Sequence, residues 1–241
     1  MKHSQISKFY DDLIENIPNY PITSTFYNDR WCMVQSESHT GFAMMCPSHM
    51  KLDLDFIHQK KTLKELSKEI SSFNFFHASF AMAAINCFYN QDKKKSNIDL
   101  VDYLSQNYQN KQIVSIGAFA FLKKTLIESL QVIEKNPKNN EYPDTASEYL
   151  IKNCDLILIT GATIINKSFE RLISLAKNKE IFLIGPSVPF YNQLFSSNIK
   201  LFGYTIDDSK KFKQLMQQNL GKKLLSSDAV KRLDSISLIK C

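Results

Sequence analysis

The 241-residue sequence contains only 6 glycines, a single tryptophan and no C-x-x-C pair among its 5 cysteines. Scattered cysteines in odd number argue against a disulfide scaffold and indicate reduced thiols. No apolar run approaches the roughly 20 residues that a membrane helix needs, and the charged N-terminus lacks the apolar segment of a signal peptide. We therefore expect a protein of the cytoplasm whose 44% hydrophobic residues fill an ordinary core.

Several common functional motifs are also missing. The chain has no P-loop, no G-x-S-x-G elbow, no H-E-x-x-H pair and no kinase signature. Its net charge of +6 comes from lysines spread along the chain, and no basic stripe is interleaved with aromatics as in nucleic-acid-binding proteins. We interpret the lysines as a solvated surface with a weak attraction for anionic small molecules or metal complexes.

The N-terminal part has the pattern of a small α+β domain. Residues 25–36 and 39–46 predict two strands joined by a polar Glu-Ser-His turn. Residues 62–90 carry apolar side chains at helical spacing in two segments, broken near residues 71–74. The polar stretch 91–111 is a predicted linker with a short helix inside it. These features predict a first domain over residues 1–105.

From residue 106 to the C-terminus the pattern is strand and helix in alternation. Strands are expected at 111–117, 131–136, 155–161, 180–187 and 200–206, and helices at 120–130, 145–153, 168–178 and 190–198. Such alternation predicts a parallel sheet with right-handed crossovers. We therefore expect an α/β protein in which residues 106–241 form a Rossmann-like domain with a mainly parallel five-stranded sheet. Residues 207–221 and 226–239 are expected to be covering helices.

The residues that follow the predicted strands form a candidate site. The carboxyl ends of parallel strands meet at one edge of a sheet, and ligands of open α/β sheets bind there. These residues are Gly117, Glu134, Thr160, Gly161, Gly185, Pro186 and Ser187. Glycine permits positive φ and lets a ligand approach the backbone amides. Any one of these glycines could serve only a tight turn, but three of them on one edge favour a ligand site.

The first of these turns does not have the pattern of a dinucleotide site. It reads "SIGAFAFLK", with one glycine where G-x-G-x-x-G requires three. Glu134 does end the second strand, where an acidic residue would hold a ribose. On balance no dinucleotide is expected.

Metal-ligating residues are scattered. Cys46 and His49 have C-x-x-H spacing and Cys32 lies upstream, so part of a tetrahedral site could form, but no fourth ligand is evident. Cysteines on strands are more often small core residues. We therefore do not expect a closed zinc site.

Two asparagines are further candidates. Asn166 and Ser168 precede a predicted helix; Ser168 would suffice as its cap, which would leave Asn166 to face the site. Asn86 lies in the helical segment "MAAINCF" and is either a buried hydrogen-bonded anchor or a site residue.

Four segments resemble a known family in their order and spacing: "ISSFNFFHASFAMAAIN", "IVSIGAFAFL", "DLILITGATIINKSFERLI" and "IFLIGPSVPF". They are similar to the putative heavy-metal chelation family, in which an enolase-N-terminal-like domain precedes a Rossmann-like domain and the cleft between them is the site. The resemblance implies a cleft lined by Asn86, Gly117, Glu134, Thr160, Gly161, Asn166, Gly185, Pro186, Ser187 and Pro189. The chain departs from the family's pattern in the "AFAF" turn, which implies a more apolar floor.

The resemblance implies a protein that binds a metal ion or a metal-chelating small molecule in this cleft, with a divalent or trivalent metal ion or its organic complex as the bound group. Oxygen donors there suit iron-like ions better than copper or zinc. Two alternatives stay open: an enzyme of metallophore synthesis or processing with Glu134 as general base, and a nucleotide-, NAD- or SAM-dependent Rossmann enzyme. We expect a small molecule or metal complex as partner, without nucleic acid or membrane, and leave a homodimer open.

Overall fold

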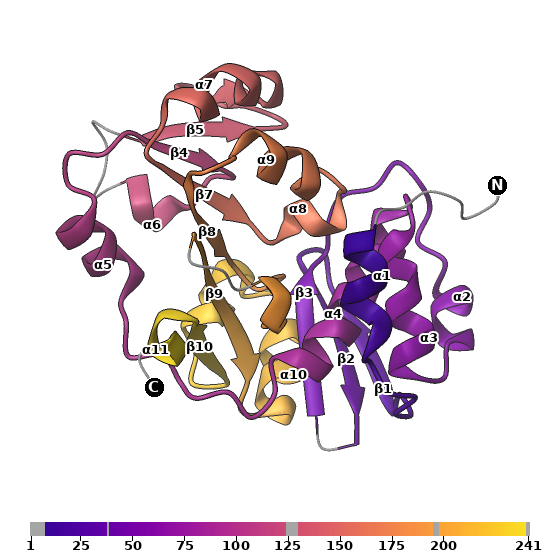
Figure 1. The fold of residues 1–241 in the computed structure, drawn as a ribbon. Coiled ribbons are helices and arrows are strands. Elements are labelled where there is room, and N and C mark those ends of the chain that lie inside the picture. Colours follow the sequence, from indigo (N-terminus) through magenta and orange to yellow (C-terminus); the bar gives the residue numbers. More distant parts are fainter. Residues whose placement is uncertain (1–7, 38, 124–129, 195–197, 240–241) are drawn as a thin grey trace. The chain divides into compact units, whose positions relative to one another are not determined.

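The computed structural model describes residues 8–37, 39–123, 130–194 and 198–239 (Figure 1). Contacts divide the chain into two compact units. The first unit comprises residues 1–94, 189–191 and 204–232, and the second comprises 95–188, 192–203 and 233–241. The boundary predicted between residues 105 and 106 falls inside α5 (Leu100–Asn107).

The first unit contains a three-stranded antiparallel sheet. Its strands are β1 (Ser24–Tyr27), β2 (Trp31–Ser36) and β3 (His39–Met44), in the order β1-β2-β3. The remaining elements of this unit are α1 (Lys8–Glu15), α2 (Leu54–Gln59), α3 (Leu63–Ser67), η1 (Lys68–Ser71), α4 (Phe75–Tyr89), α10 (Ser209–Gln217) and η4 (Gly221–Ser226).

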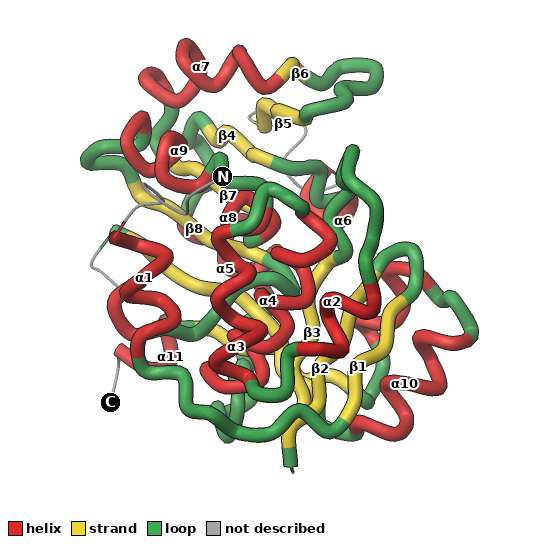
Figure 2. Tube along the Cα trace, turned by 90° about the vertical axis from the view of Figure 1, so that its right-hand side faces the viewer, coloured by secondary structure: helices red, strands yellow, loops and turns green. Residues whose placement is uncertain are grey.

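Helices cover both faces of this small sheet (Figure 2). On one face, α10 places Phe212 and Met216 against Trp31, Met33 and Phe42. On the other face, α4 lies so close to β3 that a Cβ atom at Gly41 would be 2.1 Å from the backbone nitrogen of Cys87. Both faces of β2 and β3 are therefore buried, which explains their almost continuous apolar sequence.

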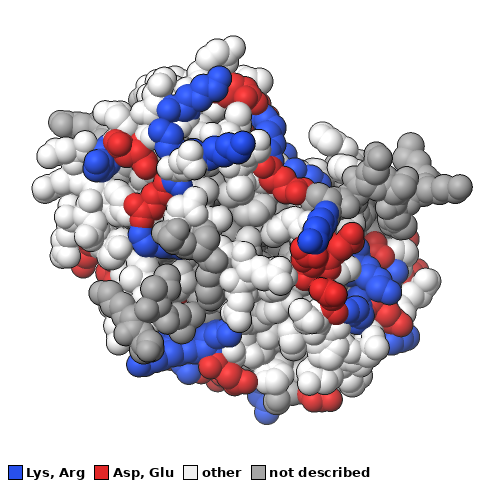
Figure 3. Space-filling model, viewed as in Figure 1, with Lys and Arg blue, Asp and Glu red and all other residues white. Residues whose placement is uncertain are grey.

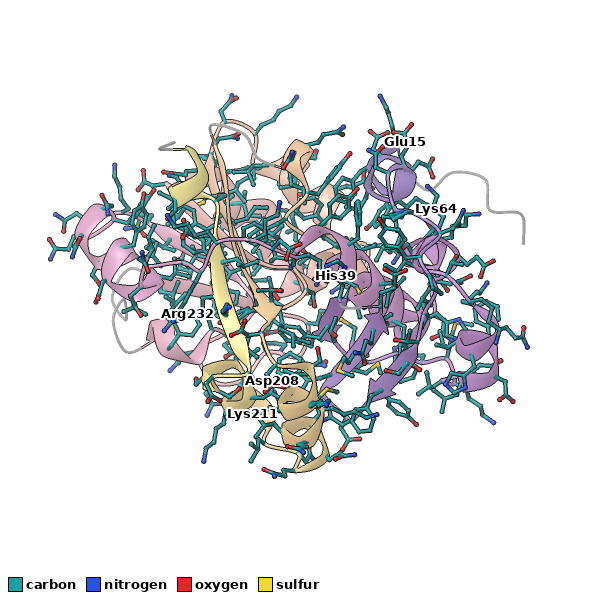
Figure 4. All side chains as sticks on the ribbon, turned by 90° about the horizontal axis from the view of Figure 1, so that it is seen from below. Glu15, His39, Lys64, Asp208, Lys211 and Arg232 are labelled. Atoms are coloured by element: carbon teal, nitrogen blue, oxygen red, sulfur yellow. The ribbon has the colours of Figure 1, made fainter. Side chains whose placement is uncertain are left out.

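Capping and backbone contacts fix the ends of the helices in this unit. Asp208 accepts a hydrogen bond from the Lys211 amide at 2.9 Å and so begins α10. The ammonium of Lys64 donates to the carbonyls of Ile14 (2.9 Å) and Glu15, which ties α3 to the end of α1 (Figure 4). The last four carbonyls of a helix have no partner within it, and the ammonium satisfies two of them.

The larger sheet has seven strands, and the side on which successive strands are added changes once. Its strands are β4 (Ile113–Ile116), β5 (Leu130–Glu134), β6 (Tyr142–Pro143), β7 (Leu156–Thr160), β8 (Glu180–Ile184), β9 (Ile199–Ile206) and β10 (Val230–Asp234). Their order is β10-β9-β8-β7-β4-β5-β6, with parallel pairing from β6 through to β9. β5 and β6 are therefore added on one side of β4, and β7 to β10 are added on its other side.

Helices cover both faces of the parallel sheet, as its apolar strands require. On one face, α5, α6 (Ala120–Lys123) and α11 (Ile236–Ile239) contribute Leu100, Leu104, Leu122 and Ile236 to a cluster with alternate strand residues. The other face carries α7 (Ser147–Asn153), α8 (Ala162–Ile165) and α9 (Phe169–Leu175) (Figure 1). The short η2 (Asp144–Ala146) and η3 (Asn192–Leu194) complete the second unit. No helix of the described residues is long and apolar enough to span a membrane.

The fold class predicted from the sequence is confirmed, with two corrections to the sheets. Residues 25–36, expected as one strand, form β1 and β2, because Asn28 accepts hydrogen bonds from the amides of Arg30 and Trp31 and so makes a turn. The large sheet has seven strands instead of five because β6 and β10 extend its edges. Ser38 of the predicted Glu-Ser-His turn lies outside the described residues.

The predicted helices also needed correction. Residues 226–239, expected as one helix, contain β10 and the short α11. The helix expected at 120–130 is described only as α6, since residues 124–129 lie outside the described part and Leu130 begins β5. The helix expected at 190–198 is the 3-10 turn η3, and residues 195–197 are not among those described.

Gly41→Ala should destabilise the protein strongly, because the new methyl group would meet backbone atoms of α4, which cannot rotate away. We expect a loss of about 3 kcal/mol in the free energy of unfolding, measured by urea denaturation. Gly221→Ala is the matched control in the same unit. Gly221 has φ +60° and its nearest neighbour, Arg30, would be 3.6 Å from the Cβ atom, so only backbone strain of about 1 kcal/mol is expected. Equal losses for the two variants would contradict the close packing of α4 on β3.

Candidate functional site

The candidate site lies where the strand order of the large sheet reverses, between β4 and β7. Gly117 follows β4 and Thr160 ends β7. A Cβ atom placed at Gly117 would lie 3.1 Å from Cγ2 of Thr160, so the two turns are in direct contact. Ligands of open α/β sheets bind at such a reversal, because the flanking connections leave in opposite directions. The sequence correctly predicted that these two turns meet.

The turn after β8 lies against the turn after β7. A Cβ atom at Gly161 would be 2.6 Å from the carbonyl carbon and oxygen of Ser187, so only glycine allows this contact. Gly185 has φ +118° but no atom within 4 Å of its Cβ position. Glycine is therefore required at 161 for packing and at 185 for backbone conformation. We call the turns at Gly117, Thr160–Gly161 and 185–187, together with Glu134, the rim.

The amides of the three rim glycines are engaged in the sheet. Gly117 donates to the carbonyl of Ile133 at 3.0 Å, Gly161 to Ile184 at 2.9 Å, and Gly185 to Phe202 at 2.9 Å. Each parallel ladder thus continues one residue past its strand. The expectation that the amides of these three glycines face a ligand is therefore wrong.

Glu134 is fixed at the rim by a hydrogen bond to the turn after β4. One oxygen of its carboxylate, Oε1, accepts from the amide of Ala118 at 2.7 Å. Ser115, only 1% exposed, donates from its hydroxyl to the carbonyl of Gly117 at 2.7 Å. Together these bonds hold the turn from both sides. Sequence reasoning missed Ser115 and Ala118, although a serine inside the apolar strand "QIVSIG" was a signal.

Thr160 and Thr163 place two hydroxyl groups at the end of β7. Thr160 is half-buried, and its Oγ1 accepts a long hydrogen bond from the Ala162 amide at 3.4 Å. Thr163 donates to the carbonyl of Thr160 at 2.7 Å and so anchors α8 to the strand. A hydroxyl that accepts one hydrogen bond can also donate one.

Two phenylalanines stand beside Gly117. The ring of Phe119 comes within 4.0 Å of the Cβ position of Gly117 and packs partly against the core of the second unit. Phe121 is 45% exposed, and its ring centroid lies 6.0 Å from that of Phe119. The "AFAF" segment thus puts an accessible aromatic ring next to the rim.

Three residues implied by the resemblance have other local roles. Asn166 accepts hydrogen bonds from the amide and the hydroxyl of Ser168, at 3.1 and 2.6 Å. Ser168 makes no side-chain cap of α9, so the expectation that it caps the helix and leaves Asn166 free is wrong. Asn86 is buried in the first unit and donates to the carbonyl of Phe42 at 2.9 Å, as an anchor between α4 and β3. Pro189 also belongs to the first unit.

The cysteines and the histidine considered as metal ligands differ in their exposure. Cys32 and Cys46 are buried, whereas His49 is exposed. Burial, reinforced by the neighbouring Cys46, raises the pKa of the Cys32 thiol far above its usual range, whereas zinc binds the thiolate. Among the described residues, no group of three His, Cys, Asp or Glu side chains could hold a metal ion.

On the face shown in Figure 3, acidic and basic side chains are interspersed.

Comparisons with known proteins identify relatives of the whole fold. Two family models, both described as "Putative heavy-metal chelation", match residues 99–233 and 10–89. A solved protein of unknown function from Desulfitobacterium hafniense DCB-2 is 24% identical with a TM-score of 0.85, covering 94% of this chain and 97% of its own. Another, from Pyrococcus horikoshii, is 18% identical with a TM-score of 0.79, covering 95% and 98%. Both belong to the family of the first model. No curated protein matches.

Glu134→Ala should destabilise the second unit, because the Ala118 amide would lose its acceptor. We expect a loss of about 1 kcal/mol in the free energy of unfolding. Glu134→Gln is the matched control, since its amide oxygen can still accept the same bond, and it should stay within about 0.5 kcal/mol of the parent protein. Urea denaturation measures both; equal destabilisation by Ala and Gln would show that the bond to Ala118 does not hold the turn.

Proposed function

Because the chain belongs to the putative heavy-metal chelation family, we propose that it binds a metal-chelating small molecule at the rim. The observation that carries this proposal is the contact between Gly117 and Thr160 where the strand order reverses. At that place the sheet offers the half-buried side chains of Thr160 and Glu134, and ligands of open sheets bind at such a reversal. Partial burial strengthens hydrogen bonds to a ligand by limiting competition from water.

The donor set of the rim fits an organic ligand better than a bare metal ion. Glu134 supplies the carboxylate and Thr160 the hydroxyl, whereas Ser187 is only 1% exposed and shapes the turn. No further His, Cys, Asp or Glu of the described residues joins Glu134 in a group of three. A metal ion would therefore enter as cargo, with most of its coordination supplied by the chelator. A hydroxyl donor and a carboxylate suit a chelator that carries carboxylate and hydroxyl groups of its own.

The other residues of the proposed site shape it. Gly161 lets the turn after β8 approach β7, with the backbone carbonyl of Ser187 packed against Gly161. Gly185 and Pro186 fix the path of that turn, one by its positive φ and the other by its ring. These residues set where the turns lie, and Thr160 and Glu134 are the groups most directly available to a ligand.

Native mass spectrometry with elemental analysis, on protein purified without chelators or metal-affinity tags, tests this proposal. We expect a co-purifying adduct that contains both a metal and an organic molecule. Thr160→Val removes the hydroxyl while keeping the shape of the side chain, and it should lower the occupancy of the adduct through an affinity loss of about tenfold.

Thr145→Val is the control for this experiment, because Thr145 is an exposed threonine in η2 of the same unit. It should leave the adduct unchanged. A metal that binds without an organic molecule would contradict the proposal, and so would an adduct whose occupancy is the same in the Thr160 variant as in the parent protein.

A further inference from the structure

We infer that the β4–β5 end of the rim binds a nucleoside without a pyrophosphate, with Glu134 taking the ribose hydroxyls and Phe121 the base. This subsite is next to the one proposed for the chelator, and it rests on the proposed function only in using the same rim. Four features of the second unit point to this subsite: the strand order, the Glu134 carboxylate, one exposed ring and two engaged amides.

The position of Glu134 is the first observation. Numbered along the chain from β4, the large sheet has the strand order 3-2-1-4-5-6 with one strand added, and Glu134 is the last residue of the second strand. In sheets of this order, an acidic residue at the end of the second strand accepts hydrogen bonds from ribose hydroxyls. The strand order is an observation of this structure and was not available from the sequence alone.

The hydrogen bonding of Glu134 is the second observation. Its Oε1 accepts from the amide of Ala118 at 2.7 Å, which orients the carboxylate over the turn after β4. A carboxylate can accept about four hydrogen bonds through its two oxygens. It therefore has the capacity to accept from the two neighbouring hydroxyls of a ribose, and its partial burial makes those bonds selective.

The exposed aromatic ring that follows the turn after β4 is the third observation. Phe121 is 45% exposed, although a phenyl ring normally gains stability from burial. It is supported from one side by Phe119, whose ring lies 6.0 Å away at an interplanar angle of 56°. A supported, accessible ring is a stacking platform for a nucleobase, and such stacking tolerates any of the four bases.

The amides of the first turn explain why the nucleoside lacks a pyrophosphate. In dinucleotide-binding sheets, free amides of this turn receive the phosphates. Here the amide of Gly117 donates to Ile133 at 3.0 Å and that of Ala118 to Glu134 at 2.7 Å. Neither is left for a phosphate, in agreement with the single glycine of the turn. The turn therefore favours an uncharged nucleoside over a dinucleotide.

Isothermal titration of the full chain with adenosine, guanosine, cytidine and uridine tests the inference. At least one ribonucleoside should bind, and the corresponding 2′-deoxynucleoside should bind at least tenfold more weakly because it lacks one of the hydroxyls that Glu134 holds. NAD should bind no more tightly than adenosine.

Substitutions assign the two contacts. Glu134→Gln keeps an acceptor for Ala118 but replaces one oxygen by an amide donor, so the preference for ribose over deoxyribose should fall to within threefold. Phe121→Ala should weaken the ribonucleoside and its 2′-deoxy form equally, by about tenfold or more. Tyr149→Ala is the control, since Tyr149 is an aromatic of α7 with 72% of its surface exposed, and it should change nothing.

Three results would overturn the inference: no ribonucleoside binds at millimolar concentration, the ribose and deoxyribose forms bind equally, or NAD binds far more tightly than adenosine. Failure of this subsite is distinguishable from failure of the chelator site. If nucleosides do not bind but a metal-containing adduct still depends on Thr160, only the nucleoside inference is wrong.

Discussion

The contact between Gly117 and Thr160 is the constraint on which the geometry of the rim depends. It joins the turns that follow β4 and β7, the two neighbouring strands between which the strand order reverses. Any side chain at position 117 would be strained, because φ is +107°, and would also press on Thr160 at 3.1 Å. The two turns can therefore approach only through glycine, and their contact brings Thr160 to the same edge as Glu134.

The glycines of the rim build it but do not supply its chemistry. Their amides extend the parallel ladders by one residue at β4, β7 and β8, so the turns are held by the same hydrogen bonds as the strands. Under the proposed function, a rim anchored in this way would need little reorganisation on binding, which lowers the entropic cost. The groups proposed to recognise a ligand are then side chains, the Thr160 hydroxyl and the Glu134 carboxylate.

The sequence predicted the elements whose pattern is strong and local. The run "LILIT" of β7 could only be a buried strand, and its meeting with the turn after β4 followed from parallel geometry alone. Residues 226–239 were mistaken for a helix because Val230, Leu233 and Ile236 recur at a helical spacing. Pairing with β9 overrides that periodicity. The bonds of the rim amides could not be predicted, since they depend on where the neighbouring strands end.

A crystal structure of the protein purified without chelators, with anomalous diffraction data, tests the central claim most directly. The account predicts an anomalous metal peak surrounded by organic density, with ligand atoms within hydrogen-bonding distance of the Thr160 hydroxyl. A metal peak coordinated by Cys46 and His49, or a rim without ligand density in a preparation that carries a metal adduct, would contradict it.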